Sequence, residues 1–380
     1  MKRIFWLFLI ILINTTQAQW LMNFSIKHAY DNNPFHIPDA YESWISTANL
    51  GVQYNFKPLS ISYIGGFTRF DQIMERNFYF HQLALFGTSG NTNWGIYADQ
   101  RLNGEDYELY DYTTYTAFLN HRLMIWNLNV FFDAHAYLNK YAQLSNIDNF
   151  ELSSGIRLNK SFPTRTTFIL GGTFIHKRYL STTETLTEVV NDEMGHGHGT
   201  GVGSSSYLIY SEMEAPSASQ FIPLMRIAQS ISQTTGIAAQ YQKRLMISGA
   251  SRFVSGLNDG YNEESQIFDD PIGYESDAVG GELTQLLPAA FYFKGAFYYT
   301  QKRYTAQGIY IDSENYDDSI LRKDIYKTAW ARLQKTIHLG FPMKGYLTIR
   351  LIYQWTNNAS NSFWYDYENQ YMALDFEFQF

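Results

Sequence analysis

The sequence contains no cysteine among its 380 residues, which excludes a disulfide framework and any thiolate metal site. Beyond the first 13 residues, no stretch approaches the roughly 18 consecutive apolar residues that a membrane-spanning helix needs. Basic residues are fewer than acidic ones, 28 against 36. Nucleic acid calls for a basic surface, so we expect no nucleic-acid partner, and no motif indicates a cofactor.

The first residues predict an export signal. Two basic residues are followed by the ten apolar residues 4–13 and then by Thr16-Gln17-Ala18, which places small residues at the −3 and −1 positions of a cleavage site. This layout is typical of a secretory signal peptide, and its apolar run is too short to span a membrane as a helix. We expect residues 1–18 to be removed and residues 19–380 to form a single domain.

The last nine residues alternate strictly between apolar and polar side chains. The apolar positions are Met372, Leu374, Phe376, Phe378 and Phe380, and the intervening ones are Ala373, Asp375, Glu377 and Gln379. Side chains two apart on a strand point to the same side, so this strand has one apolar and one polar face. An apolar exterior around a polar interior is the pattern of a transmembrane β-barrel.

The same alternation recurs at residues 59–68, 128–138 and 347–355, and aromatic residues make up 17% of the chain. Membrane barrels use such residues as girdles at the two membrane interfaces. In a soluble β-sandwich, the alternative, the apolar faces would pack on a core and the polar faces would meet water. The export signal and the aromatic content together favour the barrel.

Counting the alternating segments predicts about sixteen strands (14–18) in an antiparallel up-and-down barrel, with short turns at one end and long loops at the other. The predicted strands are 20–30, 45–56, 59–69, 77–87, 93–101, 109–122, 128–140, 149–161, 166–180, 221–232, 236–243 continuing toward 256, 278–286, 290–304, 325–338, 345–356 and 371–380. Proline, glycine and asparagine, which suit tight turns, punctuate the short end.

This pattern, with its terminal Phe380, resembles the Gram-negative outer-membrane β-barrels of the general porin type. The resemblance covers residues 19–380 in pattern and includes no family-specific motif. It implies a place in the cell outer membrane, contact with its lipid and lipopolysaccharide, periplasmic turns and outer loops. It also implies that Phe376, Phe378 and Phe380 form the signal that the barrel-insertion machinery reads.

The long loops carry most of the acidic residues. Candidates for an outer acidic surface are Glu263, Glu264, Asp269, Asp270, Asp317 and Asp318. Three interpretations stay open: a solvated surface, a vestibule that attracts cations, or carboxylates bridged to lipopolysaccharide by divalent cations.

The longest predicted loop, from Ser181 to about Gln220, contains the glycine-rich run 195–203. Its two histidines, His196 and His198, are candidate ligands for zinc or a similar ion, although glycine-rich loops of this kind are usually just mobile. A third interpretation is that this loop folds into the lumen as a constriction, as a long loop does in sixteen-stranded porins.

Several charged residues fall on the predicted inward faces. They are Asp133, His135, Arg157, Lys294, Arg332, Arg350, Asp375 and Glu377. Arg350 is expected near Asp375 or Glu377, because their strands should be neighbours. The set predicts either structural salt bridges or a transverse field across a pore that orients polar solutes.

Catalysis is the alternative for Asp133 and His135, but it requires a nucleophile beside the histidine, and Ser60 or Ser62 would have to come close. The sequence therefore favours three hypotheses in this order. The first is a passive channel for small hydrophilic solutes that favours cations. The second is a structural or docking barrel that anchors a surface or secretion assembly, with a protein partner at its long loops. The third is an outer-membrane enzyme.

Overall fold

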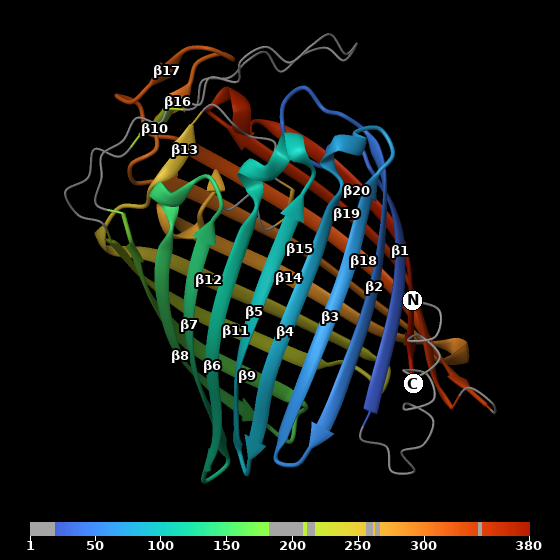
Figure 1. Cartoon of the computed structure of the whole chain (residues 1–380). Helices are drawn as coiled ribbons and strands as arrows, with labels where there is room; N and C mark the ends of the chain where they lie inside the picture. Colours follow the sequence, from blue (N-terminus) through green and yellow to red (C-terminus); the bar gives the residue numbers. More distant parts are fainter. Residues whose placement is uncertain (1–19, 182–207, 211–216, 256–260, 263–266, 341–343) are drawn as a thin grey trace, which may run out of the picture.

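Sixteen antiparallel strands form a closed barrel in which each strand is hydrogen-bonded to its neighbours in chain order (Figure 1). The computed structural model describes residues 20–181, 208–210, 217–255, 261–262, 267–340 and 344–380. The prediction of an all-β up-and-down barrel of about sixteen strands is confirmed. The predicted signal peptide lies outside the described residues.

The barrel strands are β1 (Trp20–Asp31), β2 (Ser43–Phe56), β3 (Leu59–Phe70), β4 (Phe78–Ser89), β5 (Thr92–Asn103), β6 (Tyr112–Ile125), β7 (Leu128–Tyr141), β8 (Asn149–Ser161), β9 (Thr166–Tyr179), β11 (Ser217–Ser230), β12 (Thr235–Gly249), β14 (Tyr274–Leu287), β15 (Phe291–Tyr304), β18 (Lys323–Leu339), β19 (Gly345–Ser360) and β20 (Tyr367–Gln379). Two small two-stranded sheets pair β10 (Leu208–Tyr210) with β13 (Phe253–Ser255) and β16 (Ile309–Tyr310) with β17 (Tyr316–Asp317). The 3₁₀ helices are η1 (Met74–Arg76), η2 (Glu105–Tyr110), η3 (Ser145–Ile147), η5 (Pro271–Gly273), η6 (Pro288–Ala290) and η7 (Phe363–Tyr365).

The first and last strands close the barrel. β20 pairs with β1 on one side and with β19 on the other, so that Phe376 lies beside both Ile26 and Ile349. Asp375 likewise lies between Lys27 and Arg350. The apolar and charged positions of β20 therefore line up with those of β1 and β19. This gives one apolar and one charged row across the three strands.

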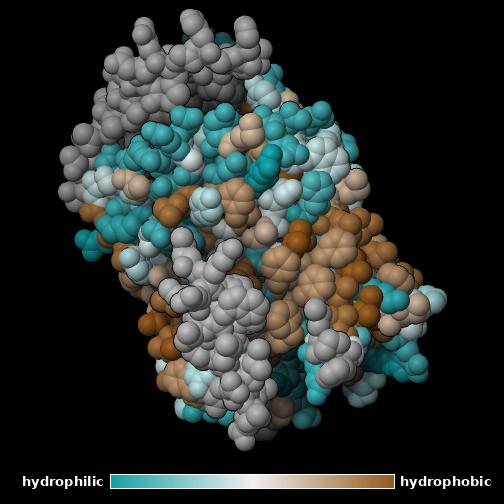
Figure 2. All heavy atoms as spheres, turned by 45° about the vertical axis from the view of Figure 1, so that its right-hand side comes forward, coloured by the Kyte–Doolittle hydropathy of each residue, from teal (hydrophilic) through white to brown (hydrophobic). Residues whose placement is uncertain are grey.

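The apolar row faces outward. Leu50, Leu83, Leu119, Leu170 and Leu351 come from five different strands, and each exposes more than 36% of its surface. Figure 2 shows the hydrophobic residues gathered in a band between two hydrophilic zones. Such a belt is costly in water and favourable in hydrocarbon, as the outer face of a membrane barrel requires. No helix among the described residues is long and apolar enough to cross a membrane.

The two ends of the barrel differ. At the turn end, two-residue turns join β2 to β3, β4 to β5 and β6 to β7. Gly90 has a φ of +58°, which glycine adopts without strain. At the loop end, at the top of Figure 1, lie the longer connections with η1, η2, η3, η5 and η7 and the two small sheets.

One loop crosses the mouth at the loop end. We call residues 267–273, which lead into β14, the crossing segment. Ile267 and Phe268 pack with Leu109 and Tyr110 of η2, with Leu144 and Ile147 beside or in η3, and with Tyr365 of η7. These partners follow β5 and β7 or precede β20, so the crossing segment reaches elements far from its own strands in the ring. The loop 181–220, predicted as a candidate constriction, lies mostly outside the described residues.

Candidate functional site

The inward row of the barrel lines a charged and aromatic lumen. The pairing register places Asp133, His135, Arg157, Lys294, Arg332, Arg350, Asp375 and Glu377 on this row. The inward rows of β4 to β9 line a cavity inside the barrel, which shows that they face the lumen.

One group of these charges is centred on Glu282 of β14. Its carboxylate accepts two hydrogen bonds from Arg226, at 2.9 and 2.8 Å, and one from the Tyr298 hydroxyl at 2.6 Å. The Lys294 ammonium lies 3.1 Å from the same carboxylate. The Tyr298 ring lies over Gly280, where a Cβ would meet its carbons at 2.1 Å, so this glycine makes room for the ring. Lys294 was predicted to face inward, but its acidic partner Glu282 was not among the predicted site residues.

A second group joins β19 to β20. The Arg350 guanidinium donates to Asp375 at 2.7 Å and also contacts Glu377, so the predicted proximity is present. Each side chain is partly exposed to the lumen, at 15–30%. The three charges hold each other in place and still face the interior. Both functions predicted for them, a structural salt bridge and a lumen field, are compatible with this geometry.

The opposite wall is aromatic. His135 of β7 stacks on Tyr137, with ring centroids 5.8 Å apart and planes 3° apart, and also on Phe118 of β6 at 6.3 Å. Arg157 lies over the ring of Phe131 at 4.9 Å. The neighbouring Asp133 lies over Gly155, where a Cβ would meet its oxygen at 2.5 Å.

The serines considered as nucleophiles lie elsewhere. Ser60 and Ser62 are on β3, and the Ser60 hydroxyl donates to Asn55 at 2.6 Å. His135 is on β7, four strands away along the ring, where it stacks on aromatic rings. The geometry of the described residues does not assemble the catalytic alternative.

The crossing segment is tied to both walls by ion pairs. Asp270 accepts from Lys177 of β9 at 2.5 Å, and Asp269 accepts from Lys302 of β15 at 2.7 Å. Burial alone would raise the pKa of Asp269, but the charges of Lys302 and Arg322 outweigh it and hold this pKa below its usual range. Asp269 therefore stays ionised at neutral pH, and the two ion pairs hold the segment across the mouth.

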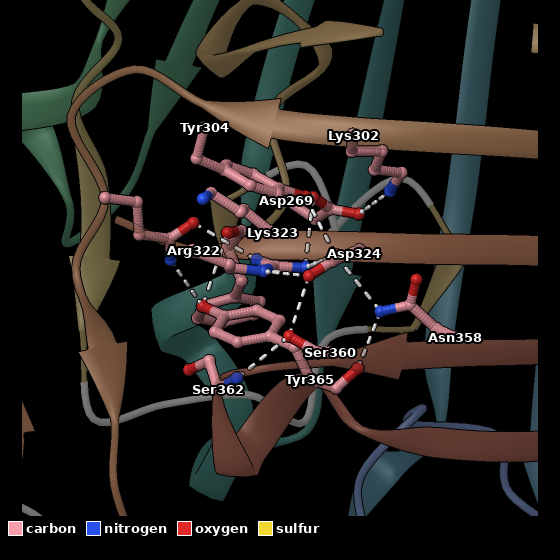
Figure 3. Close-up of polar contacts among 12 residues, drawn as sticks. Asp269, Lys302, Tyr304, Arg322, Lys323, Asp324, Asn358, Ser360, Ser362 and Tyr365 are labelled. Atoms are coloured by element: carbon pink, nitrogen blue, oxygen red, sulfur yellow. Dashed lines mark hydrogen bonds and ion pairs between the residues drawn. The ribbon is translucent and has the colours of Figure 1, made fainter. Parts of the chain in front are cut away.

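Arg322 is the central residue of the network at the β15 and β18 side (Figure 3). Its guanidinium is buried between two rings, with its carbon 4.0 Å from the centroid of Tyr304 and 3.3 Å from that of Tyr365. It donates to the buried Asp324 at 3.0 and 2.5 Å and lies 3.6 Å from Asp269. A buried guanidinium needs partners of this kind to compensate for lost water.

Two cavities lie on either side of the crossing segment. The first, which we call the tyrosine cavity, measures about 660 Å³ and lies against β4 to β9. The second, the basic cavity, measures about 470 Å³ and is lined by Lys302, Arg322 and Tyr326 among others. Pro271 and Arg244 line both, so the segment divides the mouth into two.

The other predicted loop residues fall in different places. Asp269 and Asp270 face the lumen in ion pairs rather than forming a free outer surface. Asp317 and Asp318 lie on the β16–β17 hairpin, where Asp317 accepts from the Ser319 backbone amide at 2.8 Å. Glu263, Glu264, His196 and His198 lie outside the described residues. No group of three or more metal-ligating side chains occurs in the described part of the chain.

The predicted site residues did not include Lys177, Lys302 or Arg322. A usable signal existed for two of them, because Lys177 and Lys302 occupy inward positions near the loop ends of their strands. A lysine side chain at such a position needs an acidic partner, which a loop residue can supply. Arg322 precedes its strand and carried no periodic signal.

No family model matches the sequence, and no curated protein matches it. Solved structures do resemble the barrel. Among them are OpdK, an outer membrane protein of Pseudomonas aeruginosa (10% identity, 95% of this chain and 99% of that chain, TM-score 0.54), and the same protein with vanillate (9% identity, 95% and 99%, TM-score 0.52). OccAB1 of Acinetobacter baumannii is similar too (10% identity, 95% and 96%, TM-score 0.52). At this identity the likeness is one of fold: the chain has the barrel architecture of these bacterial proteins over almost its whole length.

Proposed function

We propose that the protein is a channel of the bacterial outer membrane for the passive diffusion of small hydrophilic solutes. The observation that carries this proposal is the closed sixteen-stranded barrel with an apolar exterior and a polar, charged interior. Barrels of this size leave an aqueous lumen. The two cavities beside the crossing segment lie where solute would enter from the loop end.

The crossing segment would act as the constriction. It is held by opposite ion pairs at Asp269 and Asp270 and by an apolar cluster around Phe268. A narrow point lined by fixed charges and rings selects solutes by size and by polar contacts. We therefore expect a small conductance rather than that of a wide, unobstructed barrel.

We further propose that the channel prefers cations. This preference rests on the acidic loops, in which Asp318 is exposed and Asp317 is half-buried at the end of the β16–β17 hairpin. Carboxylates at a mouth concentrate cations. The paired Asp269 and Asp270 contribute less to this effect, because Lys302 and Lys177 neutralise them.

Single-channel recording of the purified protein in planar bilayers tests these points. We expect ohmic openings and, in a salt gradient, a reversal potential on the cation side. Replacing Asp317 and Asp318 with Asn should move that potential toward zero. An unchanged potential would remove the cation preference, and the absence of any opening would remove the channel.

The remaining expectations extend the same proposal. The belt would contact outer-membrane lipid and lipopolysaccharide after removal of residues 1–18, and Phe376, Phe378 and Phe380 would serve the insertion machinery. The outward row of β20 includes Phe376 and Phe378, as such a signal requires.

A docking barrel is the second candidate, and one observation favours it. The loops at the mouth are joined to each other, with Tyr365, Phe268 and Tyr110 in one buried cluster. A protein partner could bind this loop surface whether or not the barrel conducts solutes. Silent bilayers together with a stable, correctly folded barrel would support this candidate over the channel.

A further inference from the structure

The tyrosine cavity has the lining of a binding site. Its wall carries five tyrosines from β5, β6, β7 and β9, all at inward positions: Tyr97, Tyr112, Tyr137, Tyr141 and Tyr179. A cavity of about 660 Å³ whose wall combines aromatic rings with many polar and charged side chains is large enough for a small organic ligand.

The charges around this cavity cancel. Its acidic groups are Asp99, Glu151 and Asp270, and its basic groups are Lys177, Arg244 and Arg252. The Lys177 ammonium lies 2.5 Å from Asp270 and 3.8 Å from Glu151. In the basic cavity, by contrast, Arg244, Lys302 and Arg322 face the single carboxylate of Asp269. The tyrosine cavity therefore does not select an ion, and its electrostatics suit a neutral solute.

Hydrogen-bonding groups stand between the rings. Gln82 donates to Asp99 at 2.7 Å, and Asn139 accepts from Thr114 at 2.8 Å, so amide, carboxylate and hydroxyl groups line this part of the cavity. The side chain of Thr116 is buried, with 3% exposed, and its hydroxyl has no hydrogen-bond partner among the described residues. Thr116 lines the cavity, so a solute hydroxyl could pair with it.

The rings continue along the barrel wall below the cavity. Tyr137 is parallel to His135 within 3°, and His135 is followed by Phe118 at 26°. Tyr97 lies beside Phe118, with centroids 6.3 Å apart. These side chains form a row of flat apolar faces that leads from the mouth toward the turn end.

We infer that the tyrosine cavity binds a neutral saccharide, and this inference rests on the proposed channel function. A pyranose ring has a C–H face, which an aromatic π face attracts, and an edge of hydroxyl groups, which carboxylate, amide and hydroxyl side chains can bond. The cavity offers both surfaces without net charge. In this arrangement the pyranose ring lies on the Tyr137 ring, and the sugar hydroxyls face Asp99, Asn139 and Thr116.

The test uses maltotriose as the probe in single-channel recordings of the full mature protein. Maltotriose should interrupt the ion current in discrete events whose frequency rises with its concentration. A polyethylene glycol of equal hydrodynamic radius, which has no pyranose face, should give no such events. Equal interruption by both would show that only size matters and would overturn the inference.

Variants locate the site. Tyr137→Ala should weaken maltotriose binding about tenfold, since it removes an aromatic contact, whereas Tyr137→Phe should stay within about twofold. Tyr326→Ala, which removes a tyrosine from the basic cavity, is the matched control and should leave the affinity unchanged.

Failure of the saccharide site and failure of the proposed channel function give different experimental results. A channel that conducts but shows no maltotriose events overturns the saccharide site and leaves the channel intact. A protein that never conducts overturns the proposed function itself. If Tyr137→Ala does not fold, the wild-type comparison between maltotriose and the polymer still decides the question.

Discussion

Arg322 shows how a single buried charge organises the mouth of the barrel. Its guanidinium lies between the rings of Tyr304 and Tyr365 and donates to Asp324. Through Asp269 it also reaches the crossing segment. The residue thus connects the loop after β15, the start of β18 and the segment that narrows the lumen.

Replacing Arg322 with Leu should destabilise the barrel by about 3–5 kcal/mol, because it leaves the Asp324 carboxylate buried without its partner. The free energy of unfolding in lipid vesicles, measured with urea, checks this value. Lys323→Leu is the matched control, since the neighbouring side chain is exposed. Equal losses for the two variants would contradict the role given to Arg322.

Asp269 gives the crossing segment a predictable response to acid. Its pKa in the folded protein lies below the ordinary value of about 3.9, so the folded state favours the ionised form. The stabilisation is complete above that ordinary value and is lost as the pH falls through the lower folded pKa. The segment should therefore stay docked from neutral pH to about pH 5 and loosen below about pH 4.

Current noise and amide hydrogen exchange of residues 267–273 measure this docking as a function of pH. In Asp269→Asn the ion pair to Lys302 is missing at every pH, so the variant should be looser at pH 7 and lose most of its acid response. A variant that keeps the wild-type pH profile would show that other groups control the segment.

At the scale of single strands, the alternation of side chains decides which substitutions the barrel tolerates. Leu119 and Asn120 are consecutive residues of β6, and they face opposite sides of the sheet. Leu119 exposes 47% of its surface on the belt, while Asn120 belongs to the inward row.

Leu119→Lys should destabilise the folded barrel in vesicles by about 2–4 kcal/mol, because it places a charge in hydrocarbon near the middle of the strand. Asn120→Lys places the same group in the lumen and should cost far less. Urea unfolding of both variants in the same lipid gives the comparison. A reversed order would mean that the two faces have been assigned the wrong way round.

The strands themselves were predictable because lipid imposes a period of two on every one of them. β8 was predicted at 149–161 and is observed over the same residues, and most other bounds agree within a few residues. The largest shifts occur where loop-end segments continue a strand, as in β11, predicted from 221 and observed from Ser217. Near the loop ends the inward-facing residues are polar in some places and aromatic in others. The contrast between apolar and polar faces, from which the strands were predicted, is therefore weaker.

The crossing segment could not be predicted in the same way. Residues 267–273 have no periodicity, and their partners Lys177, Lys302 and Tyr365 lie far away in the sequence. The acidic residues Asp269 and Asp270 suggested an outer surface because charge alone does not reveal direction. Only the closure of the barrel brings the inward lysines opposite these carboxylates.

Over the whole molecule, the lumen has two different walls. The wall from β4 to β9 carries the tyrosine cavity and the row of rings below it, whereas the wall from β11 to β20 carries the paired charges around Glu282 and Arg350. A solute in the lumen would meet apolar faces on one side and fixed charges on the other. This asymmetry fits the selection of polar solutes by orientation as well as by size.

Solute entry into vesicles is the most direct measure of the central claim, that water and small solutes pass through this barrel. Lipid vesicles containing the purified protein should swell in isotonic solutions of small sugars, at rates that fall steeply as the solute grows. Vesicles of the same lipid without protein provide the baseline. Swelling at the baseline rate for even the smallest solute, with the barrel correctly folded, would contradict the channel.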